Sequence, residues 1–208
     1  MAADEWYRQT EWTEEGAALF EEKIARARSQ KAQYLTLQAY HLLDARPDVS
    51  LKLLDRADAA DQAGDGFEQA RINTFRAEAN LRLGQIEDVL AAYKRAMKRQ
   101  DGSGVIYTSA ALDYAFIVSY FEIAEEYRHA LQILEQFEGS PIGQTNAQAW
   151  GAHALILGDQ GDAAAKPLAR DALAHLGDDR EVLRQLPPQA GGIQMANFVD
   201  RLEAIATG

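Results

Sequence analysis

The residues of this chain that could perform chemistry are few and widely spaced. Cysteine is absent, which excludes disulfides, thiolate nucleophiles and zinc–cysteine sites. The four histidines lie at positions 41, 129, 153 and 175, and no two are four residues apart as the zinc motif H-E-x-x-H requires. Gly102-Ser-Gly104 lacks the third glycine of a dinucleotide loop and has no strand before it. The sequence therefore predicts no metal, no cofactor and no enzymatic activity.

Acidic side chains offer the remaining chemistry. The segment from Asp61 to Gly66 begins like a calcium loop, but Ala63 stands where a liganding side chain is needed. Ile72 occupies the twelfth position in place of a bidentate glutamate. We interpret the pairs Glu125-Glu126 and Asp178-Asp179 as solvated residues of loops or helix ends. Because carboxylates distant in sequence can meet in space, an enzyme with a carboxylate site stays an alternative.

The charge balance restricts the partner. The 208 residues include 21 basic and 32 acidic side chains, a net charge of −11. Residues 1–104 hold 15 basic and 18 acidic side chains, whereas residues 105–208 hold 6 and 14. A nucleic acid or an anionic membrane would be repelled by such a chain, so we expect a protein or peptide partner. The most apolar stretch, 110–124, is shorter than the roughly 20 residues that span a bilayer. Without an export signal or cysteine, the expected location is the cytoplasm.

The elements that position these residues are predicted to be helices. Alanine, leucine, glutamate, glutamine and arginine, which favour helices, dominate the chain, and no run alternates in the manner of a strand. Glycine and proline divide the sequence into eleven predicted helices. These cover residues 13–29, 31–45, 48–63, 67–83, 86–99, 106–124, 127–137, 145–157, 163–176, 178–186 and 193–206. The predicted fold class is all-α.

One helix pair carries a recognisable repeat, Ala77-x6-Gly84-x-Ile86-x2-Val89-x3-Tyr93-x2-Ala96. The pattern resembles the tetratricopeptide (TPR) repeat, in which small residues let two helices approach closely; Val89 stands where that family has alanine. Weaker matches align on Tyr40, Val118 and Ala154, with Glu125 in the third turn where glycine is preferred. Along Tyr40, Ala77, Val118 and Ala154 the spacings are 37, 41 and 36 residues, against a family norm of about 34.

The resemblance implies a single domain, 1–208, built as a right-handed α-solenoid of antiparallel helix pairs. Residues 31–178 would form about four degenerate repeats, with an N-terminal cap at 1–30 and a C-terminal cap at 179–208, because end repeats need a polar outer face. A generic helical bundle is the alternative. We interpret the aromatic run from Trp6 to Trp12 as a plug for the open end of the first repeat; a binding role is its alternative.

In TPR proteins the first helix of each pair lines a concave groove that holds a peptide or helix of a partner. Arg71 and Arg82 are eleven residues apart, about three helical turns, and so point the same way. They are candidates to pair a partner's carboxylates bidentately, or, alternatively, pair with Glu78 and Asp44 within the chain. The register assigns to the groove Tyr34, Gln38, His41, Arg71, Phe75, Glu78, Arg82, Phe116, Ser119 and Glu122, followed by Gln148 and Leu155.

A basic patch lies on the second helix of the best repeat. Lys94, Arg95, Lys98 and Arg99 occupy a shared flank, which we interpret as a solvated surface that complements the helix dipole. Its alternative is contact with the acidic half of a neighbouring copy, giving a homo-oligomer. The resemblance implies a non-catalytic scaffold or adaptor for protein–protein contact. A second function stays open: an acidic immunity or antitoxin-like protein that neutralises a basic toxin.

Overall fold

The computed structural model describes residues 5–64, 66–100, 108–137 and 147–208, with the side chains of residues 99 and 100 left aside. Every regular element in these ranges is a helix, which confirms the all-α fold class. The predicted breaks at 101–104 and 139–143 lie outside the described residues. Across the described ranges, no helix is long and apolar enough to cross a membrane.

The chain divides into two compact units, Met1–Ala110 and Ala111–Gly208, each described here by itself. The single domain expected over 1–208 stays a prediction. Unit 1 contains α1 (Glu14–Arg26), α2 (Lys31–His41), α3 (Pro47–Gln62), α4 (Gln69–Arg82) and α5 (Ile86–Gln100). Unit 2 contains α6 (Ala110–Tyr120), η1 (Ala124–Glu126), α7 (Tyr127–Phe137), α9 (Ala147–Asp159), α10 (Ala165–Leu176), α11 (Asp179–Gln185), η2 (Ala190–Gly192) and α12 (Met195–Thr207).

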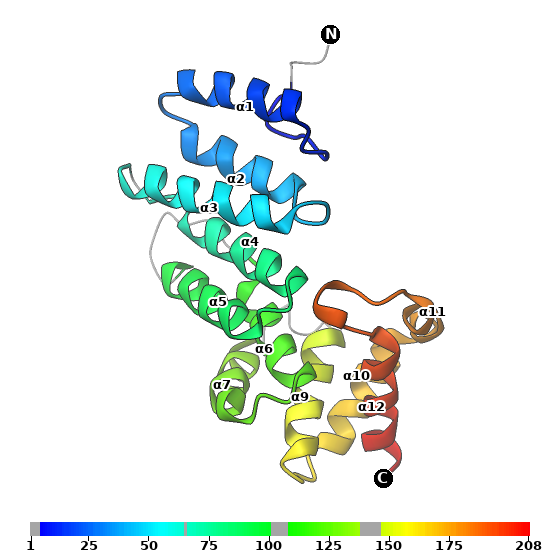
Figure 1. Cartoon of the computed structure of the whole chain (residues 1–208). Helices are drawn as coiled ribbons and strands as arrows, with labels where there is room; N and C mark the ends of the chain where they lie inside the picture. The colour runs from blue at the N-terminus through cyan, green and yellow to red at the C-terminus, as the bar shows by residue number, and fades with distance from the viewer. Residues whose placement is uncertain (1–4, 65, 101–107, 138–146) are drawn as a thin grey trace. The chain divides into compact units, whose positions relative to one another are not determined.

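In unit 1 the helices pack in chain order: α2 against α3, α3 against α4, and α4 against α5 (Figure 1). Helix α1 begins where predicted, because the side chain of Thr13 accepts a hydrogen bond from the amide of Gly16. Helix α3 begins at Pro47, whose fixed φ suits a first helical position. A core cluster that includes Phe20, Leu35 and Leu53 joins α1, α2 and α3.

Unit 2 is centred on α9, which packs against α10 and α12 (Figure 1). Two glycines of α9 permit this close approach. A Cβ on Gly151 would collide with the ring of Phe198, and a Cβ on Gly158 would lie 2.7 Å from Cδ1 of Ile205. The absence of side chains at these two positions therefore lets α12 lie against α9.

The same turn recurs after three helices. The second residue beyond α4, α6 and α9 has a positive φ: Gly84 at 71°, Glu122 at 55° and Gly161 at 73°. In each case the next amide donates to the carbonyl five residues earlier: Gln85 to Asn80, Ile123 to Val118, and Asp162 to Leu157. This is the bond pattern of a Schellman motif. The placement of Glu125 at the third turn was wrong, since Glu122 holds the equivalent position.

Several helices are shorter than predicted, and for α2 and α6 the structure shows how the helix ends. Helix α2 ends at His41 rather than Ala45, although Leu42 and Leu43 beyond it are buried, so apolar periodicity outlasts the helix. Helix α6 ends at Tyr120 because Glu122 takes a left-handed conformation. Thr108 accepts a hydrogen bond from the amide of Ala110 just before the helix.

Candidate functional site

The N-terminal segment, residues 5–13, lies against α2, and one glutamine fixes it there. The backbone amide of Gln9 donates to Oε1 of Gln38 over 3.0 Å, and Nε2 of Gln38 donates to the carbonyl of Gln9 over 2.7 Å. We call this pair of bonds the glutamine clamp. Gln38 is 0% exposed, so this predicted groove residue is engaged by the chain's own backbone. A partner could reach Gln38 only if the segment left.

Aromatic rings flank the glutamine clamp. The ring centroid of Trp6 lies 5.4 Å from Phe20 and 5.1 Å from Tyr34, and Tyr7 lies 4.8 Å from Tyr34. Trp12 packs on Phe20 at 5.6 Å. The aromatic run therefore packs on rings of α1 and α2, and its role as the plug of a first repeat stays a prediction. Tyr34, another predicted groove residue, is half-buried beneath the segment.

Beyond the segment, an aromatic face stays accessible, formed by Tyr40, His41 and Phe75. Tyr40 of α2 is 47% exposed and packs on Phe75 of α4 with centroids 4.9 Å apart. His41 packs edge-on against Tyr40. Burial lowers the pKa of His41, and the nearby cation of Arg8 lowers it further, which favours the neutral ring. The predicted groove residues His41 and Phe75 thus belong to one accessible surface.

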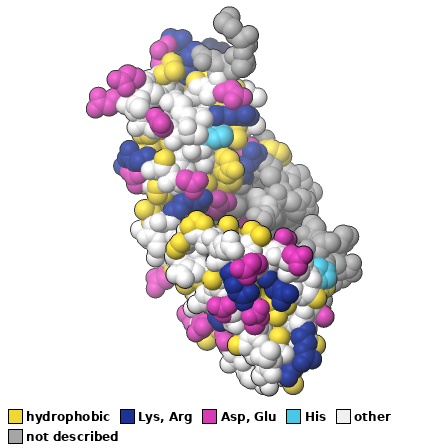
Figure 2. Space-filling model, turned by 90° about the vertical axis from the view of Figure 1, so that its right-hand side faces the viewer, with side chains coloured by type: hydrophobic (Ala, Val, Ile, Leu, Met, Phe, Trp, Pro, Cys, Tyr) yellow, Lys and Arg dark blue, Asp and Glu magenta, His cyan; other side chains and the backbone are white. Residues whose placement is uncertain are grey.

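The predicted arginines are paired within the chain. Arg82 donates to the carboxylate of Asp44 over 2.8 Å and lies 3.6 Å from that of Glu78. Arg71 pairs instead with Glu68 at 3.1 Å. The intrachain alternative is therefore confirmed for Arg82, and Arg71 has a different acidic partner from the one expected. On the face shown in Figure 2, acidic and basic side chains likewise lie interspersed rather than separated by sign.

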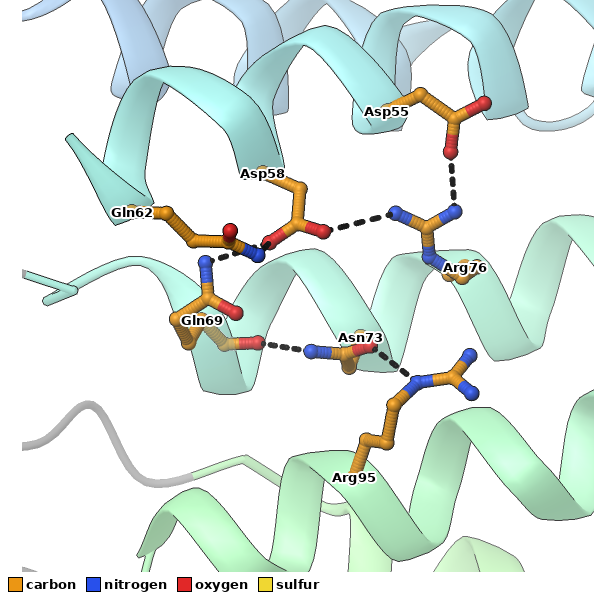
Figure 3. Close-up of a pocket in the computed structure, with 7 residues that line it drawn as sticks. All are labelled: Asp55, Asp58, Gln62, Gln69, Asn73, Arg76 and Arg95. Atoms are coloured by element: carbon orange, nitrogen blue, oxygen red, sulfur yellow. Dashed lines mark hydrogen bonds and ion pairs between the residues drawn. The ribbon is translucent and has the colours of Figure 1, made fainter.

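A polar hollow of about 450 Å³ opens between α3, α4 and α5 (Figure 3). On the α3 wall, Arg76 of α4 bridges Asp55 and Asp58. The Oδ1 atom of Asp58 also accepts amide hydrogens from Gln62 at 2.9 Å and Gln69 at 2.8 Å. Two carboxylates thus share one guanidinium, which leaves this wall with an excess negative charge.

The opposite wall of the polar hollow is cationic. Nε of Arg95 donates to Oδ1 of the buried Asn73 over 3.1 Å, and Nδ2 of Asn73 donates to the carbonyl of Gln69. Figure 3 shows the two outer nitrogens of Arg95 on the side away from Asn73. Lys98, one turn further along α5, lines an adjoining hollow of about 280 Å³. Among the described residues, neither cation has an acidic partner within 4 Å.

Asp61, where the apparent calcium loop begins, has a structural role. It is buried, and its carboxylate accepts hydrogen bonds from the amide of Glu68 at 3.2 Å and the side chain of Gln69 at 3.0 Å. These bonds fix the start of α4. In the described part of the chain, no three side chains of the metal-ligating types come together.

In unit 2, helix α12 contacts three predicted groove residues, Phe116, Ser119 and Glu122. Phe116 packs on Phe198 at 5.4 Å, and Ser119 is fully buried with its hydroxyl bonded to the carbonyl of Phe116. Arg201 of α12 donates to the carbonyl of Tyr120 and pairs with Glu122 at 3.1 Å. Of the two residues assigned to the fourth unit, Leu155 is buried and Gln148 is exposed.

Two tyrosines of unit 2 bond to carboxylates. The hydroxyl of Tyr114 donates to Glu126 over 2.6 Å and lies 3.2 Å from Nδ1 of His129. Tyr127 donates to Asp159 over 2.6 Å. Burial raises the pKa of both tyrosines far above the usual range, and the bonded carboxylates raise it further. Both phenols therefore stay protonated at neutral pH and act as hydrogen-bond donors rather than as bases.

The polar hollow was missed by sequence reasoning, although a signal for it existed. Gln69, Asn73 and Arg76 recur at spacings of four and three, so they share one face of α4. The sequence indicated the basic patch on α5, but not the polar face of α4 that packs beside it. Of that patch, Lys94 is half-buried, Arg95 and Lys98 line the hollows, and the side chain of Arg99 lies outside the described set.

Comparison with protein-family models, with curated proteins and with solved structures finds no match for this chain.

Proposed function

We propose that this protein is a non-catalytic binding protein, a TPR-like array of helix pairs that holds a short non-helical segment of a protein partner on the α2–α4 face of unit 1. The resemblance of residues 77–96 to a TPR unit suggests the array. The three equivalent turns at Gly84, Glu122 and Gly161, at which the chain reverses after α4, α6 and α9, support it. Repeats that stack in this way bury a continuous core and present an extended surface.

The observation that carries the proposal is the glutamine clamp. Gln38 pairs with both backbone groups of Gln9, an interaction that reads a peptide backbone whatever its side chains. Trp6 and Tyr7 fill the adjacent space against Tyr34. The N-terminal segment thus illustrates the kind of ligand this face would accept: a short non-helical segment with a turn and aromatic anchors.

The partner's binding position follows from what the segment leaves uncovered. The aromatic face of Tyr40, His41 and Phe75 lies next to the segment, since the segment contacts Tyr34 and Gln38 on α2, the helix that also carries Tyr40 and His41. A partner segment with an aromatic or large aliphatic anchor would pack on Tyr40 and Phe75. Aromatic residues supply much of the energy of such contacts. The cytoplasm is the compartment in which we expect this contact.

Site-specific cross-linking tests this proposal in the native cell. A photo-reactive benzoylphenylalanine replaces Phe75, and a matched chain carries it at Phe67, which is 46% exposed in the same unit. We expect one protein to cross-link at position 75 and not at position 67. Mass spectrometry of the cross-link then identifies the partner segment.

A double variant, Tyr40→Ser with Phe75→Ser, provides the second measurement. It should lose the partner found at position 75, with affinity of a synthetic copy of that segment falling at least about tenfold, the effect of losing one aromatic anchor. Leu83→Ser, at a 42% exposed position of unit 1, serves as the control. Equal binding by the double variant, or equal cross-linking at both positions, would show that the α2–α4 face is not the site.

A further inference from the structure

We infer that the polar hollow between α3, α4 and α5 is a second binding site, separate from the α2–α4 face, for a mixed-charge peptide segment in which an acidic residue is followed by a basic one. The acidic residue would pair with Arg95 and Lys98, and the basic residue with Asp55 and Asp58. The inference rests on the geometry of these walls and is independent of the partner proposed for the aromatic face.

Arg95 is held ready for a carboxylate. Its Nε is bonded to Asn73, which is itself anchored to the carbonyl of Gln69, so the plane of the guanidinium is fixed. The outer nitrogens point away from these bonds (Figure 3) and are free to make the two parallel bonds that guanidinium groups form with carboxylates. Asn73 is a positioning residue, and Arg95 makes the contact.

Lys98 adds a second cation at the same wall. It lies three residues after Arg95 on α5 and is exposed. The adjoining hollow that it lines also includes Arg95, Asn73 and Gln69. Among the residues that the structure describes, no carboxylate lies within ion-pair distance of either side chain. In a chain with a net charge of −11, two adjacent cations that pair with none of the described carboxylates create a local site of opposite sign.

The facing wall selects the kind of anion. Asp55 and Asp58 share the single guanidinium of Arg76, and the Asp55 side chain is 66% exposed. A uniformly anionic ligand, such as a nucleic acid or polyglutamate, would meet repulsion from these carboxylates. A segment with opposite charges on neighbouring residues would satisfy both walls. Like charges set against each other are the usual source of such discrimination.

The test uses the full chain and three blocked hexapeptides: alternating Glu-Lys, all-Glu and all-Lys. Isothermal titration at low ionic strength measures each affinity. We expect the alternating peptide to bind most tightly and to weaken as salt is added, because exposed charges are screened. Arg95→Gln should weaken that binding about tenfold, the effect of losing a charge-assisted bond, and Lys98→Gln should weaken it less.

Arg56→Gln is the matched control, since it removes the same charge from α3 at an exposed pair with Glu21. It should leave the affinity unchanged, as should the Tyr40→Ser and Phe75→Ser substitutions on the other face. The inference is overturned if the all-Glu peptide or inorganic phosphate binds as tightly as the alternating peptide. It is also overturned if none binds, or if Arg95→Gln and Arg56→Gln behave alike.

Discussion

Unit 1 and unit 2 each place a terminal segment of the chain over residues that the repeat register assigns to a groove. In unit 1 the cover is a short non-helical segment held by the glutamine clamp and three aromatic rings, and the neighbouring Tyr40 remains 47% exposed. In unit 2 the cover is α12, whose Phe198, Val199 and Leu202 are fully buried. The N-terminal segment is held by polar bonds at its centre and leaves part of the face exposed. Helix α12 is held by buried apolar side chains and leaves none of them exposed.

This difference implies that the covering segment of unit 1 can be exchanged for a ligand, whereas the covering helix of unit 2 stabilises the fold. The rings of Trp6, Tyr7 and Trp12 are only partly buried, so we expect that the N-terminal segment can leave without unfolding the helices beneath it. A helix that contributes its apolar stripe to a core cannot. We therefore expect a ligand to replace the terminal segment in unit 1. In unit 2, α12 is part of the core.

The largest expected effect comes from weakening the packing of α12 in unit 2. Phe198→Ala should lower the free energy of unfolding of unit 2 by about 3–5 kcal/mol, because it removes a fully buried ring that packs on Phe116. Urea unfolding followed through Trp150, with Trp6 and Trp12 replaced by phenylalanine, measures this change. Val182→Ala, at a 60% exposed position, should change it by less than about 0.5 kcal/mol. A loss below 1 kcal/mol would mean that α12 is not part of the core.

Loss of the glutamine clamp, which holds the N-terminal segment of unit 1, should have a smaller effect. Gln38→Leu keeps the side-chain volume but leaves both backbone groups of Gln9 without their partner, at a cost of about 1–3 kcal/mol. The segment should then open, and trypsin should cut after Arg8 faster than in the parent chain. Thr36→Val is the control, since it removes a buried hydroxyl that bonds only to its own helix. Cleavage at an unchanged rate would contradict a segment held chiefly by the glutamine clamp.

Substitutions at the equivalent turns of the two units should give a smaller difference in stability. Gly84→Ala should destabilise unit 1 by about 1 kcal/mol, because its φ of 71° strains any residue with a side chain although no atom lies within 4 Å of the added Cβ. Glu122→Ala in unit 2 should change stability by less than about 0.5 kcal/mol, since that turn already carries the strain and loses only an exposed ion pair. Denaturant midpoints measure both. Equal effects at the two turns would contradict their assignment as equivalent positions.

The last prediction concerns the dependence of stability on pH, which Tyr114 and Tyr127 do not affect at neutral pH but do affect in alkali. The pKa values of Tyr114 and Tyr127 are raised in the folded state, so their contribution is complete below the ordinary tyrosine pKa of about 10. Above that pH the unfolded chain releases protons that the folded chain retains, and stability falls as pH rises. Urea midpoints from pH 9 to 11 should therefore decline, and the decline should be shallower in the Tyr114→Phe, Tyr127→Phe double variant. Identical slopes would show that neither phenol resists ionisation.

Much of the fold was predictable because local signals agreed with it. Alanine-rich periodicity and the glycines at 84 and 161 marked the helices and two of the three equivalent turns. The third turn was misplaced because a glutamate in the left-handed conformation carries no signal in its residue type. The division into two units was not foreseen, since a repeat pattern describes neighbouring helices and not where contacts thin out.

The candidate sites were only partly predictable. The repeat register assigned His41 and Phe75 to one groove, and in the structure both rings pack on Tyr40. It could not reveal the glutamine clamp, which joins residues 29 positions apart. Gln38 among the apolar neighbours Leu35, Ala39 and Leu42 was the available hint, because a polar side chain on a buried face needs a partner. The polar hollow required three helices to meet and so exceeded any single-helix pattern.

The glutamine clamp has a consequence for how tightly any ligand of that face can bind. A tethered segment competes with free ligand at an effective local concentration on the order of millimolar. A partner that needs Gln38 must displace this resident copy, so its apparent affinity falls by the fraction of time that the segment is away. A partner confined to the aromatic face of Tyr40, His41 and Phe75 incurs no such loss. If the proposed partner binds at Gln38, residues 5–13 would therefore act as a competitor carried by the protein itself, and only a strong ligand would displace them.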